Sequence, residues 1–162
     1  MAMDNLKDLF VHFVRDMYYA EKQVLKTLPK MARKADSDAL RKAFEDHREE
    51  TEEQIENLEK VFDILGLKAR GVTCEAIQGI LDEGKEIMEE AGDKDTCDAG
   101  MIAAAQAVEH YEMTRYGTMV AWAKRLGMDE AADLLQKNLD QEYAADAKLS
   151  ELAEGGINKQ AA

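Results

Sequence analysis

Hydrophobic residues recur every three or four positions along most of the chain, which is the spacing of amphipathic helices. Five such segments are separated by short polar or glycine-containing breaks. The pattern predicts a first helix over residues 4–35 and a second from a cap at Asp36 or Ser37 to a stop at Gly66. It predicts three more over residues 74–91, 98–126 and 129–153. Pro29 is expected to bend the first helix or to end it early.

Four of these helices are long, and short breaks make the first pair and the last pair antiparallel hairpins. Thr73 is expected to cap the shorter third helix, and the polar run after Gly92 to separate it from the fourth. The link between the hairpins, which contains the shorter helix, is long enough to cross the bundle. We therefore predict an all-α fold: a four-helix bundle with one long crossover that carries a short fifth helix. The last residues, 157–162, are expected to fray.

Composition limits the class of protein. A chain of 162 residues, of which 46% are hydrophobic and 34% charged, fits one globular domain over residues 1–162, with an ordered core at about 4–155. The first residues do not show the pattern of a signal peptide, which is a basic segment followed by an apolar one. The sequence also has no apolar run long enough to span a membrane, so we expect a cytoplasmic protein without a membrane partner. The two cysteines form no CxxC motif, which suits a reducing compartment.

Charge narrows the choice of partners. The chain has 21 Lys and Arg residues against 34 Asp and Glu residues, a net charge of −13. Such a field repels nucleic acids and anionic lipid surfaces and concentrates cations near the protein. We therefore expect no nucleic-acid partner, and metal ions become plausible ligands.

Acidic residues fall on the apolar faces of the four long helices. Glu21 lies on this face in the first helix, and Glu112 lies at its centre in the fourth. Glu142 is central in the fifth helix, with Asp146 close to the face, and Glu50 is at its edge in the second. The acids of the shorter helix all turn away from its apolar face. Inward-facing acids are therefore a property of the four long helices only.

The most inward acid of each long helix lies near the midpoint of that helix, so an antiparallel bundle would bring the four into one layer. Buried carboxylates at one level cannot all remain ionised without compensation, so either several are protonated or cations lie among them. Carboxylates from four helices at mid-bundle are typical of di-iron and di-manganese sites, and oxygen-rich ligands suit iron or manganese. The sequence thus predicts two metal ions, iron or manganese, in the bundle core.

Further candidates lie close to these acids. His47 is near the apolar face of the second helix, where it is either a metal ligand or a core histidine. Glu109 is at the edge of the face of the fourth helix, as a ligand or an acid that supports one. For Glu112 the alternative is an internal ion pair with Arg115. The candidate metal ligands are therefore Glu21, His47, Glu50, Glu109, Glu112, Glu142 and Asp146.

Two other residue types belong to this layer by spacing. Gln54 is expected to be a hydrogen-bond partner of the site rather than a ligand. Tyr18, Tyr111 and Tyr116 are candidates to line it, although tyrosines at helical spacing usually serve packing.

Four motifs carry a resemblance to a known family: YYAEKQ around Glu21, HREETEEQ from His47 to Gln54, AAAQAVEHYEMTRYGT around Glu109 and Glu112, and DQEYAADAKL around Glu142 and Asp146. Over about residues 4–155 the chain resembles the YciF/YciE-type stress proteins of the ferritin-like superfamily. The resemblance implies a ferritin-like bundle that is often a homodimer, with a candidate dimetal site and no settled biochemical activity. The Glu-x-x-Glu motif of the fourth helix also resembles the paired glutamates of rubrerythrin-like peroxidases.

The motifs depart from the usual pattern of ferritin-like oxidases, which carry Glu-x-x-His on the second and last helices. Here the second helix has His47-x-x-Glu50 in the reverse order, and the last helix has Glu142-x-x-x-Asp146 without a histidine. A site with so little imidazole is expected to bind metal more weakly.

Two hypotheses of function follow, from different classes. The first is a dimetal-carboxylate protein of stress response that handles iron or manganese and reacts with peroxide or oxygen. In it the bridging ligands are Glu50 and Glu142, or Glu109, and the terminal ligands are Glu21, Glu112 and Asp146. The second is a non-catalytic interaction or stress-protection module with a decayed metal site, whose acids are protonated or paired with Arg115.

Overall fold

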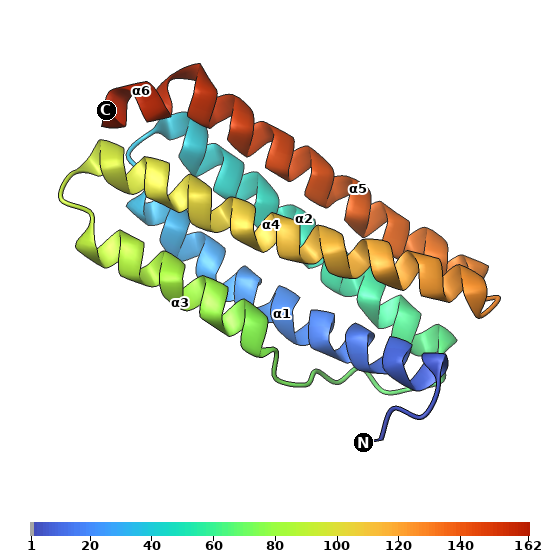
Figure 1. Ribbon diagram of the computed structural model, residues 1–162. Helices are drawn as coiled ribbons and strands as arrows, with labels where there is room; N and C mark the ends of the chain where they lie inside the picture. Colours follow the sequence, from blue (N-terminus) through green and yellow to red (C-terminus); the bar gives the residue numbers. More distant parts are fainter. Residues whose placement is uncertain (1) are drawn as a thin grey trace.

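The regular elements of the protein are all helices (Figure 1). The computed structural model describes residues 2–162, and no strand occurs among them. The helices are α1 (Leu6–Lys34), α2 (Asp38–Ile64), α3 (Glu75–Glu90), α4 (Lys94–Arg125), α5 (Asp129–Leu152) and α6 (Asn158–Ala161), with a π-helical turn at Ala153–Ile157 between the last two. The prediction of an all-α fold is confirmed.

Helices α1, α2, α4 and α5 form a four-helix bundle made of two antiparallel hairpins (Figure 1). Helix α2 ends at the opposite end of the bundle from the start of α4. The chain between them returns along α1 and then forms α3, which packs against α4 and α1 (Figure 1). This is the predicted long crossover with a short fifth helix, and it makes α2 and α4 run in the same direction.

The fourth helix begins one turn earlier than the sequence pattern predicts. Asp93 is its N-cap, and the carboxylate accepts hydrogen bonds from the backbone N–H of Thr96 at 2.9 Å and from its hydroxyl group at 2.7 Å. Part of the polar run that was predicted to be a loop is therefore the first turn of α4, because its aspartate satisfies N–H groups that the helix itself leaves free.

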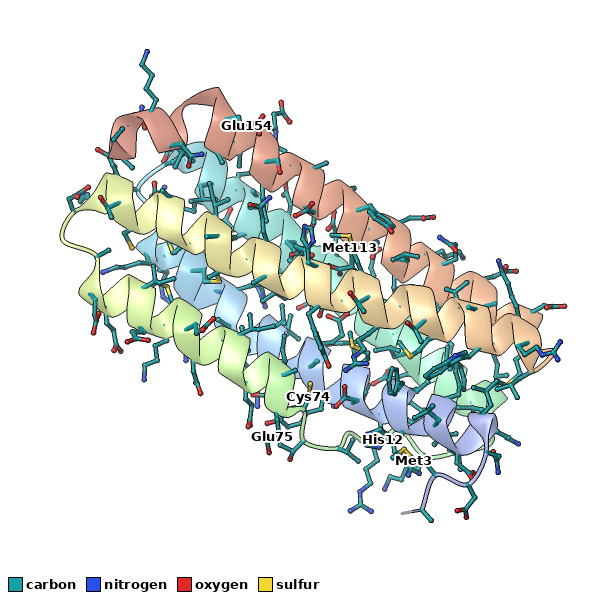
Figure 2. The ribbon with its side chains drawn as sticks, viewed as in Figure 1. Met3, His12, Cys74, Glu75, Met113 and Glu154 are labelled. Carbon is teal, nitrogen blue, oxygen red and sulfur yellow. The ribbon has the colours of Figure 1, made fainter. Side chains whose placement is uncertain are left out.

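The cap of α3 is Cys74 rather than the predicted Thr73. Its sulfur accepts a hydrogen bond from the backbone N–H of Ile77 at 3.4 Å. Cys74 lies where the crossover link meets α3, and the side chain of the next residue, Glu75, points away from the bundle (Figure 2). A thiol takes this place because the side chain is almost completely buried, where a small apolar group is favourable.

Two other expectations about helix ends change in the structure. Helix α1 continues through Pro29 to Lys34, so of the two expected effects of Pro29, a bend or an early end, the early end does not occur. After α5 the chain does not separate from the bundle. Ile157 is buried and α6 packs against α4, so a helical turn replaces the predicted frayed end.

Glycine allows the crossover to lie close to the bundle. A Cβ atom on Gly84 of α3 would stand 3.2 Å from the Cβ atom of Ala104, and one on Gly100 of α4 would overlap the side chain of Ile87. At these two positions α3 and α4 approach more closely than larger residues permit. The shorter helix α3 therefore covers the α1–α4 side of the bundle.

No helix within residues 2–162 is long and apolar enough to cross a membrane.

Asp98 connects the two hairpins at one end of the bundle. Its side chain is buried, and its two carboxylate oxygens accept hydrogen bonds from the backbone N–H groups of Asp36 at 3.0 Å and Ser37 at 2.8 Å. These donors belong to the turn between α1 and α2. The first turns of α4 are thereby fixed to the first hairpin, which sets the axial position of one hairpin against the other.

We predict that Asp98→Asn lowers the stability of the protein. An amide can accept one of the two hydrogen bonds but presents its NH₂ group to the other donor, and the expected loss is about 2 kcal/mol. For a chain of this size the midpoint of thermal unfolding should fall by roughly 4–8 °C. Asp82→Asn on the exposed side of α3 is the matched control, and equal midpoints for the two variants would contradict the prediction.

Candidate metal centre

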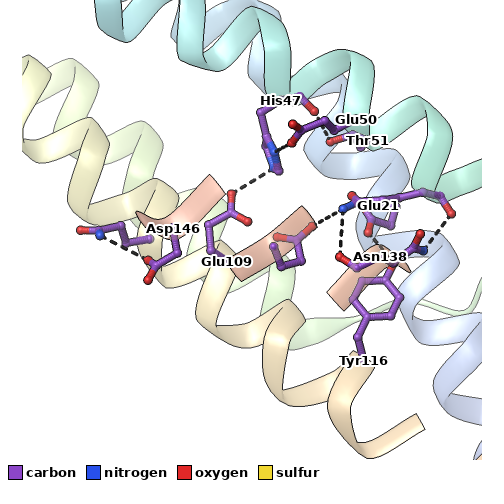
Figure 3. A network of polar contacts seen from close by, with 11 residues as sticks. Glu21, His47, Glu50, Thr51, Glu109, Tyr116, Asn138 and Asp146 are labelled. Atoms are coloured by element: carbon purple, nitrogen blue, oxygen red, sulfur yellow. Dashed lines mark hydrogen bonds and ion pairs between the residues drawn. The ribbon is translucent and has the colours of Figure 1, made fainter. Parts of the chain in front are cut away.

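Four buried side chains from three helices converge inside the bundle, and Figure 3 shows two of them, His47 and Glu109, facing each other. Each offers a ligand atom, and these atoms all lie within 4.8 Å of one another. The four are His47 of α2, Glu109 and Glu112 of α4, and Glu142 of α5. We call them the core cluster.

Helix geometry explains how α4 supplies two members of the core cluster. Glu109 and Glu112 are three residues apart, so their side chains leave the same face of the helix. His47 reaches them from α2, and its Nε2 atom lies 3.0 Å from Oε1 of Glu109. Its Nδ1 atom lies 3.2 Å from Oε2 of Glu50, one turn further along α2. The imidazole is thus fixed between two carboxylates.

Glu21 is the acid that α1, the remaining helix of the bundle, contributes to the predicted layer. Its side chain is fully buried, and Oε1 accepts a hydrogen bond from the phenol of Tyr116 (Figure 3). Glu21 lies beside the core cluster rather than within the set of atoms that defines it. Of the three tyrosines considered from the sequence, Tyr116 thus donates a hydrogen bond to a predicted ligand, whereas the hydroxyl groups of Tyr18 and Tyr111 donate to Glu59 and Asp16.

A chain of amides holds Glu142 from the other side. Nε2 of Gln54 donates a hydrogen bond to Oε1 of Glu142 at 2.6 Å, as expected for a hydrogen-bond partner of the site. Nδ2 of Asn138 donates to the backbone oxygen of Gln54 at 3.2 Å, and Oδ1 of Asn138 accepts from Asn57 at 2.9 Å. Sequence reasoning missed Asn138, although its position one turn before Glu142 on the apolar face of α5 was a usable signal.

Besides Glu21, two further predicted ligands lie outside the core cluster. Glu50 contacts His47, but its side chain is 38% exposed. Asp146 is 21% exposed and is paired with Nε2 of His110 at 3.1 Å, and it accepts a hydrogen bond from Gln106 at 3.2 Å (Figure 3). The role of both as ligands stays a prediction, and Glu50 is the nearer of the two through its contact with His47.

The alternative ion pair between Glu112 and Arg115 is not formed. The guanidinium of Arg115 lies over the rings of Phe13 at 4.4 Å and Tyr111 at 5.2 Å, and its Nε atom donates to the Tyr111 hydroxyl at 3.2 Å. Neither carboxyl oxygen of Glu112 has a hydrogen-bond partner among residues 2–162. The side chain that the alternative interpretation paired with this acid is therefore engaged elsewhere.

Burial controls the protonation of three acids in this layer. Burial raises the pKa of Glu21 to about 7, and the Tyr116 hydrogen bond opposes part of this shift. Burial, and then the negative charges of Glu142, Glu21 and Glu109, raise the pKa of Glu112 well above its usual value. Burial and the charge of Glu109 do the same for the pKa of Glu142. Without a cation, Glu112 and Glu142 retain protons at neutral pH, and Glu21 is about half protonated.

His47 and Glu109 form the charged pair of the cluster. Burial tends to lower the pKa of His47, but the charge of Glu109 and the hydrogen bonds to Glu109 and Glu50 raise it well above its usual value. Burial opposes ionisation of Glu109, yet the positive charge of His47 and its close contact with the carboxylate leave the pKa of Glu109 below the usual value. The imidazolium therefore compensates Glu109 and contacts Glu50, whereas Glu21, Glu112 and Glu142 form no ion pair within residues 2–162.

The donor set fits a metal ion. Five buried carboxyl oxygens have no hydrogen-bond partner within the described part of the chain: Oε2 of Glu21, of Glu109 and of Glu142, and both oxygens of Glu112. Buried polar atoms are normally satisfied, so such a group of acceptors calls for a cation or for protons. Carboxylates with one imidazole are the ligands of iron and manganese rather than of soft metals.

We predict that the metal-free protein loses stability as pH rises from about 5 to 8. The raised pKa values mean that folded Glu21, Glu112 and Glu142 keep protons that the unfolded chain releases above about pH 4.5, and His47 acts in the same sense above about pH 6.5. Each such group contributes a slope of up to about 1.4 kcal/mol per pH unit. Denaturant unfolding of chelator-treated protein across this range measures the slope.

Glu112→Gln tests the origin of this pH dependence. The amide imitates the neutral acid, so the slope for this variant should be shallower by about 1.4 kcal/mol per pH unit. Glu86→Gln on the exposed side of α3 should leave the slope unchanged. An unaltered slope in Glu112→Gln would show that this carboxyl group is not a source of the pH dependence.

Known proteins resemble the chain over nearly its whole length. Residues 5–162 match the family described as a domain of unknown function, DUF892. Protein YciF of Escherichia coli (strain K12) is 41% identical over 162 residues, which cover 99% of this chain and 98% of that protein.

Solved structures agree with the sequence comparison. The crystal structure of the E. coli stress protein YciF matches with a TM-score of 0.92 and covers 97% of this chain and 99% of its own. YcfI from Rhodopseudomonas palustris is 47% identical and matches with a TM-score of 0.90 over 93% of this chain and 97% of its own. The resemblance that the motifs indicate is therefore confirmed, and the chain belongs to the DUF892 family of YciF-type proteins.

Proposed function

We propose that the protein binds two metal ions, iron or manganese, at the core cluster and that it acts in stress response through the reaction of this centre with peroxide or oxygen. The observation that carries the proposal is the convergence of His47, Glu109, Glu112 and Glu142 within 4.8 Å, with Glu21 beside them. E. coli YciF is named a stress protein, which supports the physiological context.

The protein provides ligands from all four helices of the bundle. Glu109, Glu112 and Glu142 would supply most of the oxygen ligands, His47 the nitrogen ligand, and Glu21 an oxygen ligand from α1. Glu50 would join from α2 as a further ligand, because it is held one turn from His47 by their contact. The carboxyl groups would lose their protons when cations take the place of those protons.

The surroundings orient these ligands. The Gln54 hydrogen bond occupies Oε1 of Glu142 and leaves Oε2 for a cation, and the phenol of Tyr116 does the same for Glu21. Such supporting hydrogen bonds usually matter for metal affinity almost as much as the ligands themselves. Iron or manganese bound here would supply the electron transfer to peroxide or oxygen that these side chains cannot perform.

We predict that the protein, loaded with Fe(II) or Mn(II) and then desalted, retains about two metal equivalents, as measured by plasma mass spectrometry. Glu142→Gln should retain markedly less metal, because it removes a charged ligand at the centre of the cluster. Gln has nearly the same volume as Glu, so the fold should be preserved.

Glu151→Gln, on the exposed side of the same helix, is the matched control and should retain as much metal as the unaltered protein. Equal retention by Glu142→Gln and Glu151→Gln would place the metal elsewhere. Absence of retention in the unaltered protein would favour the second candidate function, a non-catalytic module whose buried acids are protonated.

Stability distinguishes the two candidates independently. Metal that binds only the folded chain should raise the free energy of unfolding by about 2.7 kcal/mol at a hundredfold excess over the dissociation constant. We therefore expect the midpoint of thermal unfolding at neutral pH to fall when EDTA is added to metal-loaded protein, and to fall much less in Glu142→Gln. If the acids are simply protonated, EDTA should leave the midpoint of both proteins unchanged.

A further inference from the structure

A cavity of about 380 Å³ lies beside the core cluster and extends between all four helices of the bundle. Its inner wall consists of buried apolar side chains, one from each helix: Leu28, Phe44, Ala105 and Leu149. Because the wall includes the bundle core, the cavity is deeper than a groove on one helix face. Its volume lies at the lower end of the roughly 300–1,000 Å³ of small-molecule sites.

Small residues explain why the cavity forms at this place. The facing sides of α2 and α5 carry alanine where larger side chains would close the gap: Ala39, Ala43, Ala144 and Ala145. Further along the same pair of helices, Gln54 and Glu142 are joined by a hydrogen bond, and the gap is closed. The cavity therefore ends at the core cluster.

The inner end of the cavity is polar. His47, Glu50 and Glu109 line it. Oε1 of Glu109 lies next to His47, but Oε2 has no hydrogen-bond partner among residues 2–162, and the residue is only 2% exposed. A buried acceptor of this kind favours a molecule that brings a hydrogen-bond donor.

The outer end does not favour an anion. Lys42 lines it, but its ammonium group is paired with Asp46, which also lines the cavity, at 2.8 Å. Lys148 lies 3.5 Å from Glu151. The two lysines are thus already matched by acids, and the net charge of −13 would oppose a second negative charge.

We propose that this cavity binds a small, uncharged and mainly apolar molecule with one O–H group, of the class of alkylphenols and medium-length alcohols, whose hydroxyl group donates to Glu109 in the metal-free protein and would lie beside the metal ions of the proposed function. The assignment rests on the proposed function and extends it, because it names the class of substrate that would meet the metal centre. The apolar walls would hold the hydrocarbon part, and the hydroxyl group would reach the one end of the cavity that is lined by His47 and Glu109.

Binding of 4-butylphenol by the full chain, measured by saturation-transfer NMR and titration at neutral pH, tests the assignment. We expect saturable binding of the phenol, and binding of the anion 4-butylbenzoate weaker by about tenfold or more. Ala145→Leu should fill part of the cavity and weaken phenol binding by about tenfold or more. Ala43→Leu, which enters from the opposite helix, should have the same effect.

Ala147→Leu is the matched control, because Ala147 is exposed on the same helix and does not line the cavity. This variant should bind the phenol as the unaltered protein does. Equal phenol binding by Ala145→Leu, Ala43→Leu and Ala147→Leu would overturn the cavity as the site, and so would absence of binding by the unaltered protein. Equal affinity for the benzoate would overturn the assignment of an uncharged donor.

The metal content of each sample separates this proposal from the proposed function. Both cavity-filling variants keep every proposed ligand and should retain the same metal as the unaltered protein. Phenol binding that is lost in these variants, in a protein that retains no metal, would support the cavity and contradict the metal function. Retained metal with no phenol binding would support the metal function and contradict the cavity as a binding site.

Discussion

The structure depends on one constraint: several carboxyl groups occupy the same buried layer of a helical bundle. Charged groups are costly to bury, and like charges within a few ångströms of each other increase that cost. His47 offsets part of this free-energy cost, because its positive charge compensates that of Glu109. The cost that is not offset raises the pKa values of Glu112 and Glu142. Under the proposed function, a pair of divalent cations would compensate the same groups without protons.

The fold brings this layer together through its connections. Two antiparallel hairpins each place acids near mid-helix, and the crossover with α3 returns the chain so that the second hairpin packs beside the first (Figure 1). Asp98 then holds the start of α4 on the turn between α1 and α2. An axial shift of one hairpin would separate Glu21 from Tyr116 and Gln54 from Glu142, so the clamp at the end of the bundle also serves the site.

The cavity and the hydrogen bonds that hold Glu142 depend on the same pair of helices, α2 and α5. Where α2 and α5 carry amides and a carboxylate, the helices are joined by hydrogen bonds, and where they carry alanines they leave a space that reaches His47 and Glu109. A metal centre that reacts with small molecules needs both a rigid ligand set and a route to it. The membership of the chain in the DUF892 family makes this combination testable on the related YciF as well.

The sequence by itself determined the helices, their pairing and the inward direction of Glu21, Glu112 and Glu142, because these depend on the 3.6-residue period of each segment. The sequence pattern predicted the wrong first residue or cap where a local contact determines how a helix begins, as with Asp93 at the start of α4 and Cys74 at the start of α3. Only the tertiary structure decided that Arg115 stacks on Phe13 instead of neutralising Glu112, that Asp146 turns to His110, and that Asn138 supports Gln54. The rotation of a side chain toward one of two possible neighbours depends on how helices far apart in the sequence pack, and the period of one helix contains no information about the other.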